Sequence, residues 1–290
     1  MVYYNYNKPW KENMAKKLTD YEAALRHQYR VEPGGPTVPG VTTVLNIVDK
    51  PALPWAASKI AAETALIEHS RKRTIVRRHR KTLTALGKKE REMGFNGSDD
   101  EVFIHYCRGE FRRQWDAKME RGTRVHAVAE AWTKAPGEPV DVRVEDSGFV
   151  DALEAFYRDC RPTFLHAELM VLNDIYAYGG RFDAIVEMDA GTMLIDYKTG
   201  GHYEQSLAMQ QVAYMHGSLA TYDEAGALGE YKDLPKIDGA RGIYLHEDGT
   251  YEVVDPFKNI SQELAWEGFT SCLKLYNTVK EMDRVMKEGE

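Results

Sequence analysis

The chain has 290 residues, of which 43% are hydrophobic, and its formal net charge is −7. This apolar content can form a sizeable core, as one large domain or two small ones, but no apolar run is long enough to span a bilayer. The N-terminus lacks the pattern of a signal peptide, and the three cysteines are too scattered for a disulfide framework. We therefore expect a cytoplasmic protein that makes no contact with a membrane.

The negative net charge, taken alone, argues against a nucleic-acid partner, but the basic residues are concentrated in one segment. Between Arg71 and Glu92 there are ten Lys or Arg and two acidic residues, a local charge of +8, which leaves 28 basic and 43 acidic residues elsewhere. Such a segment either contacts phosphate groups or is only a solvated helix face that aids solubility.

The first part of the chain, residues 1–120, is predicted to be mainly α-helical. Breakers around Pro33 and Pro51 separate the first elements, and either Thr42 or Thr43 is expected to cap the helix between these breakers. Helices are expected over residues 9–28, from about Trp55, over the basic segment 71–92, and over 101–134 as one or two helices.

The second part of the chain, residues 121–290, is predicted to mix helices with β-hairpins, through turns such as Asp248-Gly249. One strand is expected to carry Glu168, and the last helix is expected to bury Leu264, Phe269, Leu273 and Tyr276. The expected elements are a helix over 148–161, a strand over 164–171, a hairpin over 181–198, a helix over 204–221, a loop over 223–239, a hairpin over 241–254 and a helix over 261–287.

Two carboxylates and a lysine stand out on the hairpin over 181–198. Side chains alternate along a strand, so Asp196 and Lys198 share one face while Ile195 and Tyr197 share the other. If the two strands pair, Asp183 on the first strand approaches Asp196, and the two can bind one divalent cation beside Lys198. Carboxylate oxygens favour Mg²⁺ or Mn²⁺, which suit phosphodiester hydrolysis. The alternative is a solvated surface ion pair.

Four segments of the chain, in order, resemble the motifs of the PD-(D/E)XK nuclease superfamily. Within it, the pattern resembles the RecB-like branch, which includes CRISPR-associated adaptation nucleases and many phage exonucleases. The matches cover about residues 120–216: Gly122–His126 is similar to the G-x-x-x-H element, Gly180–Asp183 to G-x-x-D, Asp196–Gly200 to D-x-K-T-G, and Gln210–Tyr214 to Q-x-x-x-Y. A weaker similarity to the entry segment of phage members lies at Val38–Leu45.

The resemblance implies a role for each matched residue. It implies metal ligation by His126, Asp183 and Asp196, with Glu168 at a position that is often acidic in the family. Catalytic or positioning roles fall to Asp183, Asp196, Lys198, Gln210 and Tyr214. Ordinary alternatives stay open: His126 as a satisfied core histidine, Glu168 as a charge on an edge strand, and Gln210 with Tyr214 as a buried pair.

Three neighbouring residues are harder to interpret. Glu130 shares a helix face with His126 and is a candidate to orient it. Arg181 either contacts phosphate or faces solvent. Glu187 is expected to be exposed rather than catalytic.

Departures from the family pattern narrow the expected function. Phe182 replaces the proline that names the superfamily, as is usual in this branch. Cys107, Cys160 and Cys272 lie far apart with no C-x-x-C, so no iron–sulfur cluster is expected. The chain also lacks a G-x-x-x-x-G-K-[ST] loop, so it carries no P-loop motor.

The resemblance implies an α/β fold with a restriction-endonuclease-like core, that is, a mixed sheet flanked by helices. The expected function is Mg²⁺- or Mn²⁺-dependent DNA hydrolysis by an exonuclease in phage or bacterial replication, recombination or repair. Expected partners are DNA and a helicase or a single-strand-annealing recombination protein, in a bacterial or phage-infected cell. The alternatives are a structure-specific endonuclease of the same fold and an inactive protein that binds DNA or serves as a scaffold.

Overall fold

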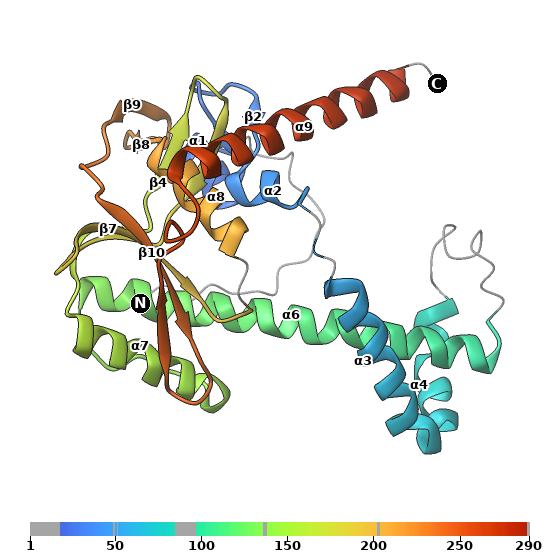
Figure 1. Cartoon of the computed structure of the whole chain (residues 1–290). Helices are drawn as coiled ribbons and strands as arrows, with labels where there is room; N and C mark the ends of the chain where they lie inside the picture. Colours follow the sequence, from blue (N-terminus) through green and yellow to red (C-terminus); the bar gives the residue numbers. More distant parts are fainter. Residues whose placement is uncertain are drawn as a thin grey trace.

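The computed structural model describes residues 18–48, 50, 52–84, 97–135, 138–201 and 204–288. The protein is mixed α/β, with a mixed sheet flanked by helices (Figure 1). Every helix within the described ranges is too short or too polar to cross a membrane. The helices are α1 (Asp20–Leu25), α2 (Val41–Leu45), α3 (Ala52–Glu68), α4 (Lys72–Thr84), α6 (Asp99–Lys134), α7 (Ser147–Cys160), α8 (Glu204–Met215) and α9 (Gln262–Glu288), with 3₁₀ turns at His69–Arg71 and Val144–Asp146.

The strands form a five-stranded sheet in the order β11-β10-β7-β6-β3, a four-stranded sheet in the order β5-β4-β8-β9, and the pair β1-β2. In the five-stranded sheet β10 runs parallel to β7 and the other neighbours are antiparallel. The strands are β1 (Tyr29–Arg30), β2 (Thr37–Val38), β3 (Thr163–Ala167), β4 (Met170–Asn173), β5 (Tyr178–Arg181), β6 (Ala184–Met188), β7 (Gly191–Lys198), β8 (Ser218–Tyr222), β9 (Leu228–Lys232), β10 (Gly239–Leu245) and β11 (Tyr251–Val254).

The five-stranded sheet buries both of its faces. On one face, Ile195 and Tyr197 of β7 pack against apolar side chains of α6 and α7, such as Val125 and Phe156. On the other face, Leu194 of β7 belongs to the cluster formed by α2, α8 and α9. The alternation of β7 thus turns Tyr197 toward α6, while Asp196 and Lys198 turn toward α8, as the sequence predicts.

The helices α3 and α4 pack on the first third of α6, at the end of α6 that lies far from the sheet (Figure 1). We call this unit, with α6 up to Cys107, the helical arm. Its core contains Ile75 and Val76 of α4 against residues of α6, with Ala65 of α3 partly buried beside them. Residue 120, where the sequence predicts a boundary between two parts, lies within the continuous helix α6.

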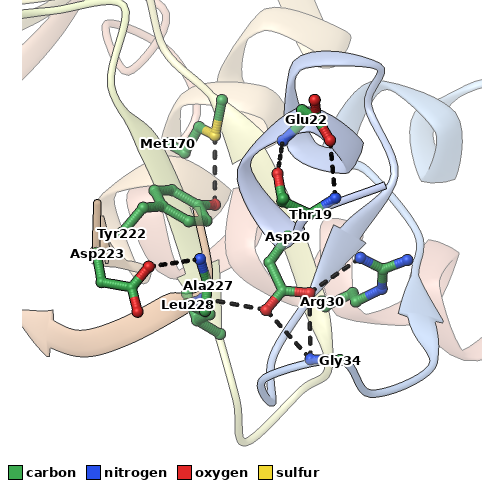
Figure 2. A network of polar contacts seen from close by, with 10 residues as sticks. All are labelled: Thr19, Asp20, Glu22, Arg30, Gly34, Met170, Tyr222, Asp223, Ala227 and Leu228. Carbon is green, nitrogen blue, oxygen red and sulfur yellow. Dashed lines mark hydrogen bonds and ion pairs between the residues drawn. The ribbon is translucent and has the colours of Figure 1, made fainter. Parts of the chain in front are cut away.

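A buried carboxylate ties the N-terminal segment to the four-stranded sheet (Figure 2). Asp20 is only 7% exposed and accepts hydrogen bonds from the Arg30 guanidinium at 2.9 Å, the Gly34 amide at 3.1 Å and the Leu228 amide at 3.0 Å. Burial alone raises the pKa of Asp20, but these donors outweigh it and hold the pKa below its usual value. Residues 18–38 are therefore part of the folded body.

Several predicted elements have different bounds in the structure. The strand predicted over 164–171 is wrong, because β3 and β4 belong to different sheets and Glu168 lies between them with a left-handed φ of 54°. The helix predicted over 204–221 ends at Met215, since Leu219 of β8 pairs with Val171 of β4. The loop predicted over 223–239 contains β9, which pairs with β8.

Other corrections concern caps and side chains. Thr42 and Thr43 lie inside α2, whose N-cap is Gly40, so neither caps it. Leu264 is 60% exposed rather than buried, because α9 instead turns Ala265 toward Ala208 and Val212 of α8. Residues 101–134 form a single helix, α6. The helix predicted over 9–28 lies partly outside the described residues, and within them only α1 is helical.

Candidate metal and phosphodiester site

The site lies at the junction between the two sheets. The chain passes from β3 to β4 and returns from β5 to β6, so that β3 pairs with β6 in the five-stranded sheet and β4 pairs with β5 in the four-stranded sheet. At the crossing, the Glu168 amide donates to the Asp183 carbonyl at 2.8 Å and the Phe182 amide donates to the Leu169 carbonyl at 3.2 Å. Glu168 and Asp183 are thereby held side by side, although they are fifteen positions apart in the sequence.

His126 reaches this crossing from α6. Its Nδ1 lies 3.3 Å from Asp183 Oδ1, and its Nε2 lies 3.0 Å from the backbone carbonyl oxygen of Tyr197. Burial alone lowers the pKa of His126, but the Asp183 carboxylate outweighs burial and raises the pKa to about 9. His126 is therefore positively charged at neutral pH while no cation occupies the site.

His126, Glu168 and Asp183 form a group with the composition of a metal site. Each residue offers one ligand atom, and the three atoms lie within 4.8 Å of one another. Burial, followed by the charge of Asp183, raises the pKa of Glu168 to about 7. Arg181 Nε lies 2.9 Å from Glu168 Oε2 and offsets part of this effect. Two carboxylates and an imidazole are a donor set that can hold a divalent cation.

A second group of side chains lies on the α8 side of β7. The Nζ of Lys198 is 2.5 Å from Oδ2 of Asp196, and Asp196 is only 4% exposed. Gln210 on α8 bridges the two, since its amide nitrogen donates to Asp196 Oδ1 at 3.0 Å and its amide oxygen accepts from Lys198 at 3.1 Å. The same amide nitrogen lies 3.1 Å from the hydroxyl of Tyr214. Gln210 thereby fixes the lysine and the carboxylate in one arrangement.

The two groups interact electrostatically. Burial raises the pKa of Asp183, but His126 and then Lys198 outweigh it, so the pKa lies below its usual value. For Asp196, burial dominates over the pairing with Lys198 and raises the pKa. Burial lowers the pKa of Lys198, yet Asp196 outweighs this and raises it, so Lys198 is a cation at neutral pH. A protonated lysine can donate hydrogen bonds but cannot accept a proton.

Two motif glycines have steric reasons to be glycine. A Cβ on Gly180 would lie 2.4 Å from Cε1 of Tyr214, so only glycine leaves room for that ring. A Cβ on Gly122 would lie 3.3 Å from Oγ1 of Thr199, so Gly122 lets α6 approach the end of β7 closely. Close packing around the site thus explains why glycine occupies these two positions.

The structure brings the site residues of the sequence together as two adjoining groups. His126, Glu168 and Asp183 form one, and Asp196 and Lys198 with the α8 pair Gln210 and Tyr214 form the other. Asp183 itself lies in the bend before β6 rather than on a strand.

The neighbouring residues have varied environments. Glu130 forms an ion pair with Lys134 at 3.0 Å, and within the described part of the chain no side-chain hydrogen bond or ion pair joins it to His126. Arg181 contacts Glu168 rather than facing solvent alone. Glu187 is exposed, as expected.

The backbone of Tyr197 is a part of the candidate site that the sequence did not indicate. Its amide donates to Asp183 Oδ2 at 2.7 Å, and its carbonyl lies against His126. Because backbone groups are the same at every residue, no sequence signal could have singled them out. Its phenol lies 3.0 Å from that of Tyr157 on α7, which holds the strand end against the helix.

The basic segment 71–92 is described as far as Thr84, where α4 ends, and residues 85–92 lie outside the described part. Lys72 pairs with Asp100, and Arg80 pairs with Asp99. Within the described residues, Arg73 and Arg77 are exposed and have no ion-pair partner. Part of this charge is therefore used inside the helical arm, and part is open to solvent.

No protein-family model matches this chain, and no curated protein matches it. The resemblance to the PD-(D/E)XK nucleases rests on the four motifs.

Proposed function

We propose that this chain is a metal-dependent exonuclease that hydrolyses DNA, with a restriction-endonuclease-like core. The observation that carries the proposal is the convergence of His126, Glu168 and Asp183 beside the Lys198–Asp196 pair, at one crossing of the two sheets. The alternative is that these charges form an ion pair on a solvated surface hairpin. It does not account for the Asp196 side chain, which is 5% exposed and bound to both Lys198 and Gln210. The order of the four motifs supports the same assignment.

The donor set suits a hard divalent cation. His126, Glu168 and Asp183, whose ligand atoms lie together, would hold Mg²⁺ or Mn²⁺. The resemblance implies Asp196, from the adjoining group, as a further ligand, and one nitrogen among carboxylate oxygens is a set that both ions accept. When bound, such an ion polarises a phosphoryl oxygen and lowers the pKa of water at the site. The charge of the ion would displace the proton of His126, because an imidazole must be neutral to be a ligand.

Lys198 would supply positive charge to the phosphate. Its raised pKa keeps the ammonium protonated, so its role is to stabilise negative charge rather than to remove a proton. Gln210 would position Lys198 and Asp196 together through its two hydrogen bonds. Tyr214 would in turn position Gln210. This chain of contacts makes Gln210 and Tyr214 positioning residues.

The test compares end-labelled linear DNA with a closed circle of the same sequence, each with Mg²⁺ and with EDTA. An exonuclease needs an end, so we expect release of labelled nucleotides from the linear DNA in Mg²⁺ and an intact circle. Cutting of the circle at the same rate would make the protein an endonuclease. Cleavage that continues in EDTA would refute the metal site.

A matched pair of variants assigns the activity to the site. Lys198→Ala removes the ammonium that pairs with Asp196, and Lys274→Ala removes an exposed lysine on α9. We expect the first variant to lose at least a hundredfold in cleavage rate, in line with the removal of a charge-stabilising group, and the second to keep the wild-type rate. Equal activity of all three proteins would refute the assignment.

A further inference from the structure

The middle of α6 connects the sheet to the helical arm with most of its surface open. Residues 112–114 and 116–120 are exposed, and Trp115 is half-buried. Figure 1 shows this part of α6 between the sheet and α3. Packing against other elements stabilises this exposed part of the helix little, so its side chains are available to contact a ligand.

One side of this helix lies in line with His126. Arg108 precedes His126 by eighteen residues, which is about five turns, so the two side chains leave the helix in the same direction. Trp115 and Met119 fall within about 20° of the same line at about 100° per residue. Within the arm, α3 and α4 pack on the opposite side of α6, through Phe103 and Tyr106, which lie about 140° and about 160° from this line. The side that points toward the site is thus the uncovered one.

The residues on this side have the chemistry of a surface that binds single-stranded nucleic acid. The rings of Trp115 and Phe111 lie 5.9 Å apart, and neither is fully buried. Arg108 is exposed and has no ion-pair partner among the described residues. Arg112 is 80% exposed, with its Nε bound to Asp116. Aromatic rings stack on bases, and arginines bind the backbone phosphates.

This side of α6 begins at the candidate site itself. Gly122, which falls about 40° from the line through His126, lies against Thr199, the residue after Lys198. Arg121 leaves the helix on a different side, and its guanidinium donates to the Thr199 carbonyl at 3.4 Å. Lys198 is 32% exposed, so it is open to a ligand. A strand held at Lys198 would therefore meet the exposed part of α6 within about two turns.

We propose that a single DNA strand runs from the site along this side of α6, with its bases against Trp115 and its backbone at Arg108. The proposal rests on the proposed nuclease function for the identity of the ligand. An apolar partner helix is the other ligand that exposed rings could bind. The arginines beside the rings favour DNA, because an apolar helix would leave Arg108 desolvated and unpaired.

The length of the helix sets a scale for the strand. From His126, Trp115 lies about 16 Å and Arg108 about 27 Å along the helix axis. At about 3.4 Å per stacked nucleotide, these distances correspond to about five and about eight nucleotides. A strand of four nucleotides bound at the site would reach neither residue.

The test is the Kd for fluorescein-labelled oligo-dT of 4, 8 and 16 nucleotides, measured by anisotropy in EDTA so that no cleavage occurs. We expect Trp115→Ala and Arg108→Ala each to bind the 16-mer about tenfold more weakly than wild type, within the range found for loss of one stacked base. The same variants should bind the 4-mer like wild type. Trp115→Phe, which keeps an aromatic ring, should restore most of the lost affinity.

The matched control is Arg113→Ala, which removes an arginine from the opposite side of α6, where it pairs with Glu110. Affinity for the 16-mer that is unchanged in Trp115→Ala and Arg108→Ala, or equally weakened in Arg113→Ala, would refute the proposed path. A protein that cleaves DNA but shows either result refutes this inference alone. A protein with the expected length dependence but no cleavage refutes the nuclease function alone.

Discussion

Replacing Gly180 by alanine should disturb the site without touching a charged residue. The added Cβ would lie 2.4 Å from Cε1 and 3.1 Å from Cδ1 of Tyr214, a residue that is only 3% exposed. The ring must therefore shift, and the Tyr214 hydroxyl moves away from Gln210, 3.1 Å distant in the native arrangement. Overpacking of this kind costs about 1–3 kcal/mol of the free energy of unfolding.

The same substitution should also slow cleavage. Losing the Tyr214–Gln210 hydrogen bond frees the amide that holds Asp196 and Lys198, and a bond of this kind contributes about 1 kcal/mol, or roughly a five- to tenfold change in rate. The assay is urea unfolding followed by circular dichroism, with the cleavage rate measured below the unfolding transition.

Gly200→Ala is the control for this prediction. Gly200 ends the D-x-K-T-G element, and among the described residues no atom lies within 4 Å of a Cβ placed on it. We expect wild-type stability and rate from this variant. If Gly180→Ala matched Gly200→Ala in both stability and rate, the packing of Tyr214 against β5 would have no part in forming the site.

Three further predictions concern stability and metal binding. Asp20→Ala should lower the free energy of unfolding by about 3 kcal/mol in urea, because it leaves Arg30, whose side chain is only 12% exposed, without its carboxylate. Gly148→Ala should prevent stable folding, seen as a loss of soluble protein, because its Cβ would lie 1.8 Å from the carbonyl oxygen of Glu247. Mn²⁺ affinity, measured by calorimetry, should rise from pH 6 to pH 9, because pKa values of about 7 for Glu168 and about 9 for His126 mean that both must lose protons to bind the ion.

The raised pKa of His126 also predicts how the stability of the metal-free protein changes with pH. The pKa of His126 is about 9 in the folded protein and about 6.5 when unfolded, so its pairing with Asp183 stabilises the fold fully below pH 6.5. This contribution is lost as the pH rises from 6.5 to 9. His126→Gln should remove that part of the pH dependence of the melting temperature. An unchanged pH profile in this variant, or Mn²⁺ affinity that does not vary with pH, would contradict the charge assignment.

Local pattern was enough to predict the β6–β7 hairpin and the faces of β7. The alternation of apolar and polar residues up to Lys198, with Gly191 at the turn, predicts that Asp196 and Lys198 share a face. The structure confirms this, since the two side chains are in contact and both turn toward α8. Helix spacing likewise predicted that Gln210 and Tyr214 share a face, and they are hydrogen-bonded.

The change of sheet could not be predicted from the sequence. Period-two alternation shows that a segment is extended but not which sheet it joins, so residues 164–171 look like one strand. The turn of direction at Glu168 depends on its pairing with Asp183, a contact between residues far apart in the sequence. For the same reason the Arg181–Glu168 ion pair, which lies beside the candidate metal ligands, was not foreseen.

The most direct test of the account is the Mg²⁺-dependent release of nucleotides from end-labelled linear DNA by wild-type protein and by Asp183→Asn. This change removes one charge from the side chain that contacts both His126 and the Tyr197 amide. The account predicts that wild type degrades the DNA, and that Asp183→Asn remains folded but is inactive. Degradation by both proteins at the same rate, or by neither in Mg²⁺ or Mn²⁺, would contradict it.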